Sequence, residues 1–125
     1  MIFGIGTDII EVKRIQSLIE KGPKFKERIF TSKEIEYCDS KKNAAENYAA
    51  RFAAKEAFLK AIGMGWRRGF AFKDIEILKD SLGKPEIRLY GKAENFIREK
   101  GISKIQVSLS HIKEFANAIV TIERS

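Results

Sequence analysis

The sequence predicts an α+β fold in which a small, mostly antiparallel sheet packs with one long and several short helices. Residues 44–62 form a helical stretch that is rich in alanine and has no internal glycine or proline. From Phe70 onward, apolar and polar side chains alternate with the period of a strand. Residues 1–10 add one strand before the first helix. The length fits a single domain, residues 1–125.

The first strand places Gly4, Gly6 and Asp8 on one face, because alternate residues of a strand point to the same side. The two glycines remove side chains from that face. Something can therefore approach the backbone closely there. A helix with apolar side chains at helical spacing is expected next, over residues 11–19.

Short segments separate this first helix from the long one. A Gly-Pro pair at residues 22–23 ends the first helix, and residues 24–30 form a short basic segment. Thr31 followed three residues later by Glu34 is the pattern of a capped helix start. Asn43 is expected to cap the long helix, and Gly63 to end it.

The second half of the chain supplies most of the sheet. The expected order is strand 72–78, turn 81–85, strand 86–90, helix 91–100, strand 105–110 and strand 115–123. No internal repeat, low-complexity segment or linker interrupts it.

The charge of the chain predicts an anionic partner. Its formal net charge is +7 and its isoelectric point is about 9.6. Nucleic acid, an acidic protein, a phosphorylated small molecule and an anionic membrane all remain open on this ground. No apolar run approaches the ~20 residues that span a bilayer, and the N-terminus lacks the basic start of a signal peptide. We therefore expect a cytoplasmic, soluble protein without membrane association. The single cysteine, Cys38, is interpreted as a structural residue.

Glu56 is the first candidate for chemistry. It lies in the middle of an apolar face of the long helix, where an unpaired carboxylate is costly. That face is also expected to hold Ala45, Tyr48, Ala49, Phe52, Leu59 and Gly63. An ion pair with Lys60, four residues on, is the simpler explanation. The crowding of Arg51, Lys55 and Lys60 on the same helix favours a functional role instead.

Asp8 is the second carboxylate, on the glycine-cleared face of the first strand. One interpretation makes it the N-cap of the following helix. The other pairs it with Glu56 as a ligand of magnesium, which prefers carboxylates together with phosphate oxygens and water.

Other patterns are weaker. Residues 4–9 have Ile9 where a dinucleotide-binding fingerprint needs its third glycine. Residues 63–65 follow a helix instead of opening one, so they are not a Walker loop; a plain helix stop and an anion-binding backbone nest both remain open. In the segment 108–111, Ser110 and His111 are neighbours on a strand and face opposite sides, which disfavours a nucleophilic pair. The chain lacks a His and Cys set for zinc.

Taken together, several segments resemble the holo-acyl-carrier-protein synthases of the short bacterial type. They are Gly4-Ile5-Gly6-Thr7-Asp8-Ile9-Ile10, Arg14-Ile15, Phe52-Ala53-Ala54-Lys55-Glu56-Ala57-Phe58-Leu59-Lys60-Ala61, Gly83-Lys84-Pro85 and Ser108-Leu109-Ser110-His111. The resemblance covers the whole chain, and the Ala-Ala-Lys-Glu-Ala helix combined with the early Gly-x-Asp is its most specific part. Met64 and Trp66 depart from the residues common in that family.

The resemblance implies the 4′-phosphopantetheinyl transferase fold and reaction. Such enzymes move 4′-phosphopantetheine from coenzyme A, their substrate, to a serine of apo acyl carrier protein and release adenosine 3′,5′-bisphosphate, in the service of fatty acid biosynthesis. It implies that Asp8 and Glu56 hold Mg²⁺, with Lys60 as a third catalytic residue. The implied coenzyme A contacts are Arg51, Lys60, Gly63, Gly65, Pro85, Ser110 and His111. The implied carrier-protein surface holds Arg14, Lys21, Lys24 and Arg28. A homotrimer with sites between subunits is implied as well.

The chemistry of this reaction agrees with the residues present. The nucleophile arrives on the carrier protein, so the chain needs no catalytic triad. We expect a water held by a carboxylate near Asp8 or Glu56 to take the proton, or Glu56 to take it directly. A nucleic-acid-binding module and a module that only binds carrier proteins are the competing hypotheses. Against the nucleic-acid module, basic residues are mixed with acidic ones, and no strand shows paired exposed aromatics.

Overall fold

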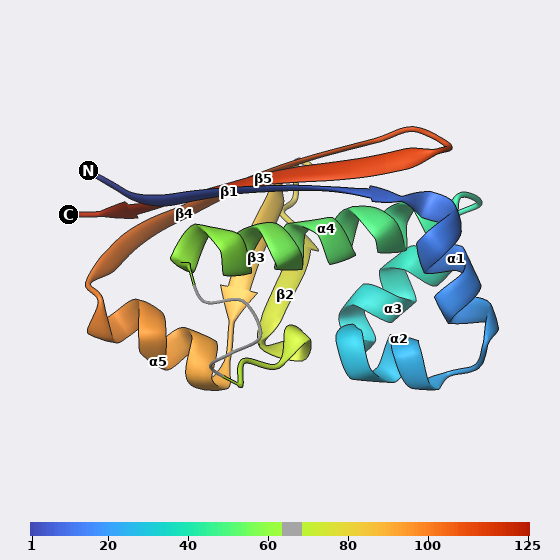
Figure 1. The fold of residues 1–125 in the computed structure, drawn as a ribbon, viewed down its shortest axis with the longest axis horizontal. Coiled ribbons are helices and arrows are strands. Elements are labelled where there is room, and N and C mark those ends of the chain that lie inside the picture. The colour runs from blue at the N-terminus through green and yellow to red at the C-terminus, as the bar shows by residue number, and fades with distance from the viewer. Residues whose placement is uncertain (64–68) are drawn as a thin grey trace.

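The computed structural model describes residues 1–63 and 69–125 (Figure 1). Its elements along the chain are β1 (Ile2–Glu11), α1 (Val12–Glu20), α2 (Lys24–Ile29), α3 (Ser32–Asp39), α4 (Ala44–Ile62), the 3-10 turn η2 (Phe72–Asp74), β2 (Ile75–Lys79), β3 (Pro85–Leu89), α5 (Gly91–Glu99), β4 (Ile102–His111) and β5 (Phe115–Arg124).

The strands form two antiparallel sheets. The larger has the order β1-β5-β4, and the smaller pairs β2 with β3. Helix α4 runs along the larger sheet, with α1, α2 and α3 gathered at one of its ends and α5 at the other (Figure 1). The predicted α+β class with a mostly antiparallel sheet is confirmed. Strand β1 lies at an edge of the larger sheet, where it pairs with β5.

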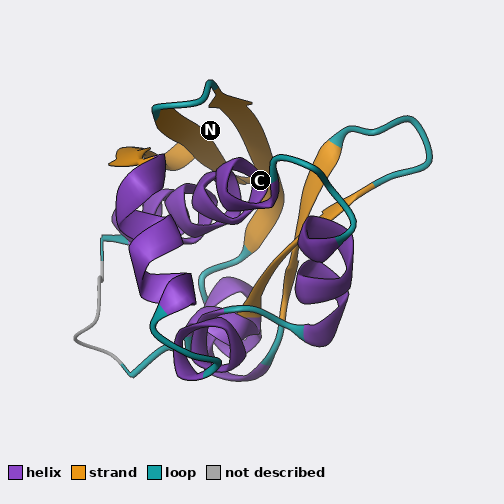
Figure 2. Ribbon diagram, turned by 90° about the vertical axis from the view of Figure 1, so that its right-hand side faces the viewer, coloured by secondary structure: helices purple, strands orange, loops and turns teal. Residues whose placement is uncertain are grey.

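The two ends of the described chain lie side by side, as both Figure 1 and Figure 2 show. The amino group of Met1 donates to the carbonyl oxygen of Arg124 at 3.0 Å, and the Arg124 N–H donates back to Met1 at 2.8 Å. Further along this pairing, Asp8 lies opposite Ala118. The position of Asp8 therefore depends on β5.

Gly4 and Gly6 make room for helix α4. A Cβ atom added to Gly4 would overlap the carbonyl oxygen of Ala61, and one added to Gly6 would overlap that of Ala57. The sequence predicts that something approaches this cleared face, and it is the backbone of the long helix. The close approach places the strand that carries Asp8 directly against the helix that carries Glu56 and Lys60.

Helix α4 is buried on most of its surface, so the prediction of a single apolar face is wrong. Arg51 and Lys55 are almost fully buried, whereas Phe52 and Glu56 are only half-buried. The helix packs against the larger sheet and also against α1, α3 and β2. Its many alanines allow neighbours on several sides to approach closely.

Most predicted helix ends agree with the structure. The capping box of Thr31 and Glu34 is present, and Gly63 ends α4 with a φ of 74° in the left-handed region that favours glycine. Asn43 occupies the N-cap position, but its side chain makes no capping hydrogen bond; its Oδ1 accepts from Nδ2 of Asn47 at 3.0 Å.

Three segments differ from the sequence-based prediction, and one of them is the strand expected over residues 105–110, which spans Ile102–His111 as β4. Residues 24–30, expected to be only a short basic segment, contain helix α2. The strand expected over residues 72–78 begins at Ile75, because η2 precedes it. Within the described residues, no helix combines the length and the apolar character needed to cross a bilayer.

Candidate functional site

Strand β1 and helix α4 bring three predicted site residues together. Nζ of Lys60 donates to Oδ1 of Asp8 at 3.0 Å and to the carbonyl oxygen of Thr7 at 3.1 Å. The Asp8 side chain is 16% exposed and the Lys60 side chain 55% exposed. The N-cap of α1 is Glu11, so the N-cap interpretation of Asp8 is wrong. Lys60 pairs with Asp8, and no hydrogen bond or ion pair to Glu56 is found among the described residues.

Glu56 lies in the electrostatic environment of the same cluster. Burial raises the pKa of its carboxyl group above the ordinary range, and the negative charge of Asp8 raises it further. Lys60 and Arg14 act in the opposite direction. Two carboxylates and one cation therefore meet at this place, which we call the acidic cluster: Asp8, Glu56 and Lys60. Arg14 lies outside it, near enough for its charge to act on Glu56.

The donor set of the acidic cluster fits magnesium. Carboxylate oxygens are the hard ligands that magnesium takes, and it keeps several waters of its own, so two protein ligands suffice. Asp8 is partly exposed and Glu56 half-buried, which leaves room for other oxygen ligands. In the part of the chain that the structure describes, no group of three or more His, Cys, Asp or Glu side chains could hold a metal ion.

Lys55, the neighbour of Glu56, lies in a different environment. Its Nζ is fully buried and donates to Oε1 of Glu34 at 2.8 Å, to the carbonyl of Ile29 at 2.9 Å and to that of Phe72 at 3.0 Å. Oε2 of Glu34 accepts from the Ile77 N–H at 3.0 Å. This ion pair ties α4 to α3 and β2, and no atom of it faces the acidic cluster.

A second group of predicted residues lines a separate hollow of about 450 Å³ between α4, β4 and the turn from β2 to β3. We call it the cationic pocket. Its lining includes Arg51, Lys79, Lys84, Pro85, Ser108 and His111. Among the residues that the structure describes, no aspartate or glutamate lines it. Such a pocket is suited to an anion.

Arg51 is held rigidly in the cationic pocket. Its guanidinium carbon lies 4.3 Å from the centre of the Tyr37 ring, a stacking geometry that arginine favours. The residue is 2% exposed, and its Nε is buried without a hydrogen-bond partner among the described residues. A buried donor without a partner is costly, so Arg51 carries an unsatisfied donor beside this pocket.

The sequence missed two cations of this pocket. Lys84 belongs to the Gly-Lys-Pro turn, where its charge could have been noted, whereas Lys79 becomes a pocket residue only through the pairing of β2 with β3. Ser110 was predicted, but Ser108 is the serine that lines the pocket.

The predicted coenzyme A residues fall into two places. Arg51, Pro85 and His111 line the cationic pocket, whereas Lys60 belongs to the acidic cluster. Lys60 lies nine positions after Arg51 on α4, which corresponds to ~13.5 Å along the axis and to opposite faces of the helix. Gly63, beyond Lys60, is an exposed helix end, and Gly65 lies outside the described residues, as do Met64 and Trp66. One chain does not bring the two groups together.

The basic residues of the predicted carrier-protein surface surround an apolar groove of about 580 Å³. Lys21, Lys24 and Arg28 line it together with apolar side chains. The apolar part consists of Leu18, Pro23, Phe25, Ile29 and Phe52. Arg14 does not line this groove; it lies on α1 within reach of the charge of Glu56.

The outer surface of the larger sheet is also apolar. Ile5 and Ile9 of β1 are 62% and 69% exposed, and Ile119 of β5 is 41% exposed. Ile112 and Phe115, at the turn between β4 and β5, continue the exposed apolar surface.

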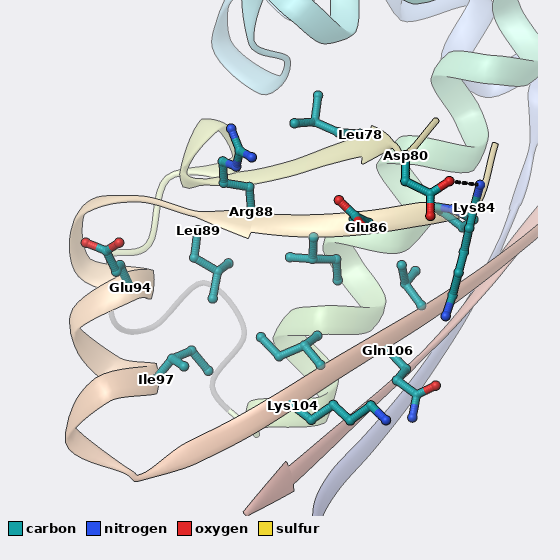
Figure 3. Close-up of a pocket in the computed structure, with 14 residues that line it drawn as sticks. Leu78, Asp80, Lys84, Glu86, Arg88, Leu89, Glu94, Ile97, Lys104 and Gln106 are labelled. Atoms are coloured by element: carbon teal, nitrogen blue, oxygen red, sulfur yellow. Dashed lines mark hydrogen bonds between the residues drawn. The ribbon is translucent and has the colours of Figure 1, made fainter. Parts of the chain in front are cut away.

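A further groove, of about 610 Å³, opens between β3 and β4 and is bordered by α5 (Figure 3). Its lining mixes both charges: Glu86 and Glu94 are acidic, and Arg88 and Lys104 are basic. Figure 3 shows these four side chains around the groove. Of the predicted site residues, only Pro85 lines it. Because its charges are balanced, it is less suited to an anionic ligand than the cationic pocket.

Comparisons with known proteins agree on one family. Residues 4–121 match the 4′-phosphopantetheinyl transferase superfamily. A holo-acyl-carrier-protein synthase of Geobacter metallireducens is 50% identical over 125 residues, covering 99% of each chain. The crystal structure of holo-acyl-carrier-protein synthase from Neisseria meningitidis is 41% identical, with a TM-score of 0.91 over 99% of this chain and 100% of that one. A synthase from Bacillus anthracis, in complex with coenzyme A (3′,5′-ADP), is 40% identical, with a TM-score of 0.83 over 100% of this chain and 99% of the other.

Proposed function

This chain belongs to the 4′-phosphopantetheinyl transferase superfamily, and we propose that it transfers 4′-phosphopantetheine from coenzyme A to a serine of apo acyl carrier protein. The serine oxygen forms a new bond to phosphorus, the phosphoanhydride bond of coenzyme A breaks, and adenosine 3′,5′-bisphosphate leaves. The observation that carries this proposal is the full-length match to holo-acyl-carrier-protein synthases, joined to an acidic cluster and a cationic pocket on one helix.

We assign the chemistry to the acidic cluster. Asp8 and Glu56 are the residues that would hold Mg²⁺, which would neutralise charge on the phosphoanhydride oxygens. Lys60 faces the same place and supplies a positive charge that stabilises the negative charge of the transition state. Its partial exposure leaves it free to turn from Asp8 towards a phosphate.

The serine proton needs an acceptor in the acidic cluster. A water held by the carboxylate of Asp8 or Glu56 is the acceptor that we favour. Glu56 is the direct alternative, because burial and the charge of Asp8 raise its pKa and so increase its affinity for a proton.

We propose that coenzyme A binds across two copies of the chain. The cationic pocket offers Arg51, Lys79 and Lys84 to the phosphates of the nucleotide end. The acidic cluster lies ~13.5 Å further along α4 and on its opposite face, so both groups of one chain do not meet on one pyrophosphate. Two subunits, each contributing one group, would complete the site.

A homotrimer is the assembly that we propose for this purpose. The exposed apolar surface of the larger sheet supports self-association, because large contiguous apolar patches on soluble proteins usually mark interfaces. Ile5, Ile9 and Ile119 would become buried there. Because all three side chains are exposed in the single chain, we expect assembly to reduce their exposure to solvent strongly.

The carrier protein would dock on the groove rimmed by Lys21, Lys24 and Arg28, with Arg14 between that groove and the acidic cluster. Basic residues attract an acidic helix over a distance, and the apolar floor accepts a side chain from it. This position would lead the carrier serine towards Asp8 and Glu56.

We place the activity in the cytoplasm and in fatty acid biosynthesis, as a single domain acting on coenzyme A and carrier protein. The buried free thiol of Cys38 is compatible with a reducing compartment. Burial raises its pKa to about 12, which disfavours the reactive thiolate.

Mass spectrometry tests the proposed reaction directly. Apo acyl carrier protein incubated with the chain, coenzyme A and Mg²⁺ should gain the mass of one phosphopantetheine group on its serine, and the reaction should release adenosine 3′,5′-bisphosphate. Binding of carrier protein without any mass gain would favour a binding module. A salt-sensitive oligonucleotide complex without turnover would favour a nucleic-acid module.

A further inference from the structure

The one histidine of the chain forms a pair that the proposed reaction does not explain. Nδ1 of His111 lies 2.9 Å from Oε1 of Glu46. His111 is the last residue of β4, and Glu46 lies in the first turn of α4, 65 positions away in sequence. The side chains are 29% and 20% exposed, so both are partly shielded from water.

The chemistry of the pair determines which ring nitrogen carries hydrogen. An ionised carboxylate only accepts hydrogen bonds, so Nδ1 of His111 must be the donor. The other nitrogen, Nε2, has no hydrogen-bond partner among the described residues. The hydrogen bond at one nitrogen thus fixes the tautomer and limits rotation of the ring.

Glu46 and His111 face different hollows. His111 lines the cationic pocket, whereas Glu46 is absent from its lining. Glu46 instead lines an adjoining groove with Lys42 and Lys113. The carboxylate therefore contacts the imidazole from outside the cationic pocket.

We propose that Glu46 is a positioning residue for coenzyme A binding: it accepts a hydrogen bond from Nδ1–H of His111 and so holds the imidazolium form of the ring with Nε2–H directed at the phosphates in the cationic pocket. This inference rests on the proposed function for the identity of the ligand. Nε2–H of the imidazolium adds a charged donor beside Arg51 and Lys84, while Nδ1–H donates to the carboxylate of Glu46.

Nitrogen NMR on protein labelled with ¹⁵N-histidine tests the pairing without any turnover. The single histidine gives only two side-chain nitrogen signals. In the wild type, above the pH at which the ring loses its charge, Nδ1 should carry the proton. In Glu46→Ala the proton should move largely to Nε2, the form preferred by free histidine. A wild-type ring that already has its proton on Nε2, or an unchanged spectrum in the variant, would overturn the inference.

Calorimetric binding of coenzyme A, without carrier protein, tests the consequence. Glu46→Ala should weaken binding about three- to tenfold, the range for one lost hydrogen bond. Glu46→Gln keeps an acceptor oxygen and should recover most of the affinity. Combining Glu46→Ala with His111→Ala should cost no more than His111→Ala alone, because the carboxylate acts through the ring. Equal additional weakening in the double variant would contradict a positioning role.

A matched control separates this effect from a general loss of negative charge. Glu36→Ala removes an exposed carboxylate from α3 and should leave the affinity unchanged. If coenzyme A binds with the predicted dependence on Glu46 but no group is transferred, the proposed reaction is wrong while the role of Glu46 in binding is supported. If Glu36→Ala weakens binding as much as Glu46→Ala does, the effect is not specific to the partner of His111 and the positioning role is wrong.

Discussion

Lys55 and Glu56 are neighbours in sequence and opposites in environment. Lys55 is fully buried, and its ammonium group donates to three oxygen atoms, one of them on Glu34. Glu56 is half-buried, has no hydrogen bond or ion pair among the described residues, and has a raised pKa. A helix turns by about 100° per residue, which is enough to direct adjacent side chains to different surroundings.

The difference separates stability from chemistry within one short motif. The hydrogen bonds of the buried Lys55–Glu34 pair are largely satisfied, and the pair fixes α4 against α3 and β2. The network continues through Thr31, whose hydroxyl donates to Oε2 of Glu76 at 2.6 Å. Glu56 has no such partners, so its carboxylate is available to a cation or a proton. The satisfied pair holds the helix in place so that the unsatisfied carboxylate is correctly positioned.

The strongest test of this contrast is Lys55→Met. The substitution should lower the free energy of unfolding by about 3–5 kcal/mol, because it leaves Glu34 buried without its cation. Urea denaturation measures the change. The double variant Lys55→Met, Glu34→Gln should be more stable than the single one, since the buried charge is removed. A loss below 1 kcal/mol in the single variant would mean that the pair is not structural.

The complementary substitutions are Asp8→Ala and Glu56→Ala. Each should lower kcat at least about 1,000-fold, equivalent to about 4 kcal/mol in the barrier, because the metal-binding carboxylates are lost. Neither should lower the melting temperature, since neither residue belongs to the buried network. Turnover is measured across a magnesium series beside thermal melts. Full activity of either variant at low magnesium would contradict the assignment.

Charge reversal of Arg14 and Arg28 should have a smaller effect, confined to one substrate. We expect the KM for carrier protein to rise about tenfold and the KM for coenzyme A to stay nearly constant, because these charges mainly steer the encounter. Added salt should weaken the wild type towards the variant, since exposed charges are screened. Equal effects on both substrates would place the docking surface elsewhere.

The smallest expected effect is a gain in stability. Because burial and Asp8 raise the pKa of Glu56, its ionised form opposes folding above that pKa. Below the ordinary carboxyl pKa of about 4.3, the group is protonated in both states and the cost disappears. Glu56→Gln should therefore raise the melting temperature at neutral pH by about 2–5 °C, and the gain should shrink as the pH falls towards 4.

Glu36→Gln is the control for this measurement, because it changes an exposed carboxylate on α3. It should give no gain that depends on pH. If Glu56→Gln raises the melting temperature equally at every pH, removal of the ionised carboxylate is not the cause of the gain.

Local patterns predicted much of the fold. Strand alternation, the capping box at Thr31 and the glycine stop at residue 63 depend on neighbours within a few positions, and all are confirmed. The burial of α4 was mispredicted, because a periodic pattern reports the face towards one partner and this helix has several.

The candidate site was predicted less evenly. The acidic cluster was predicted through Asp8 and Glu56, since isolated carboxylates near glycines and apolar residues are visible in a sequence. Partners joined only by the fold were missed. Glu34 lies 21 positions from Lys55, and Glu46 lies 65 positions from His111. No spacing rule connects residues so far apart, so the structure is needed to see them.

The pairing of β1 with β5 has a consequence for how the chain folds during its synthesis. Asp8 leaves the ribosome long before Ala118, the residue opposite it, because the two lie at far-apart positions in the sequence. Until β5 emerges, β1 lacks the strand that it pairs with among the described residues, and the glycine contact with α4 must form without that support. Closing so long a loop is entropically expensive and slows folding. The acidic cluster is therefore assembled late, and a chain interrupted before β5 has no properly placed Asp8.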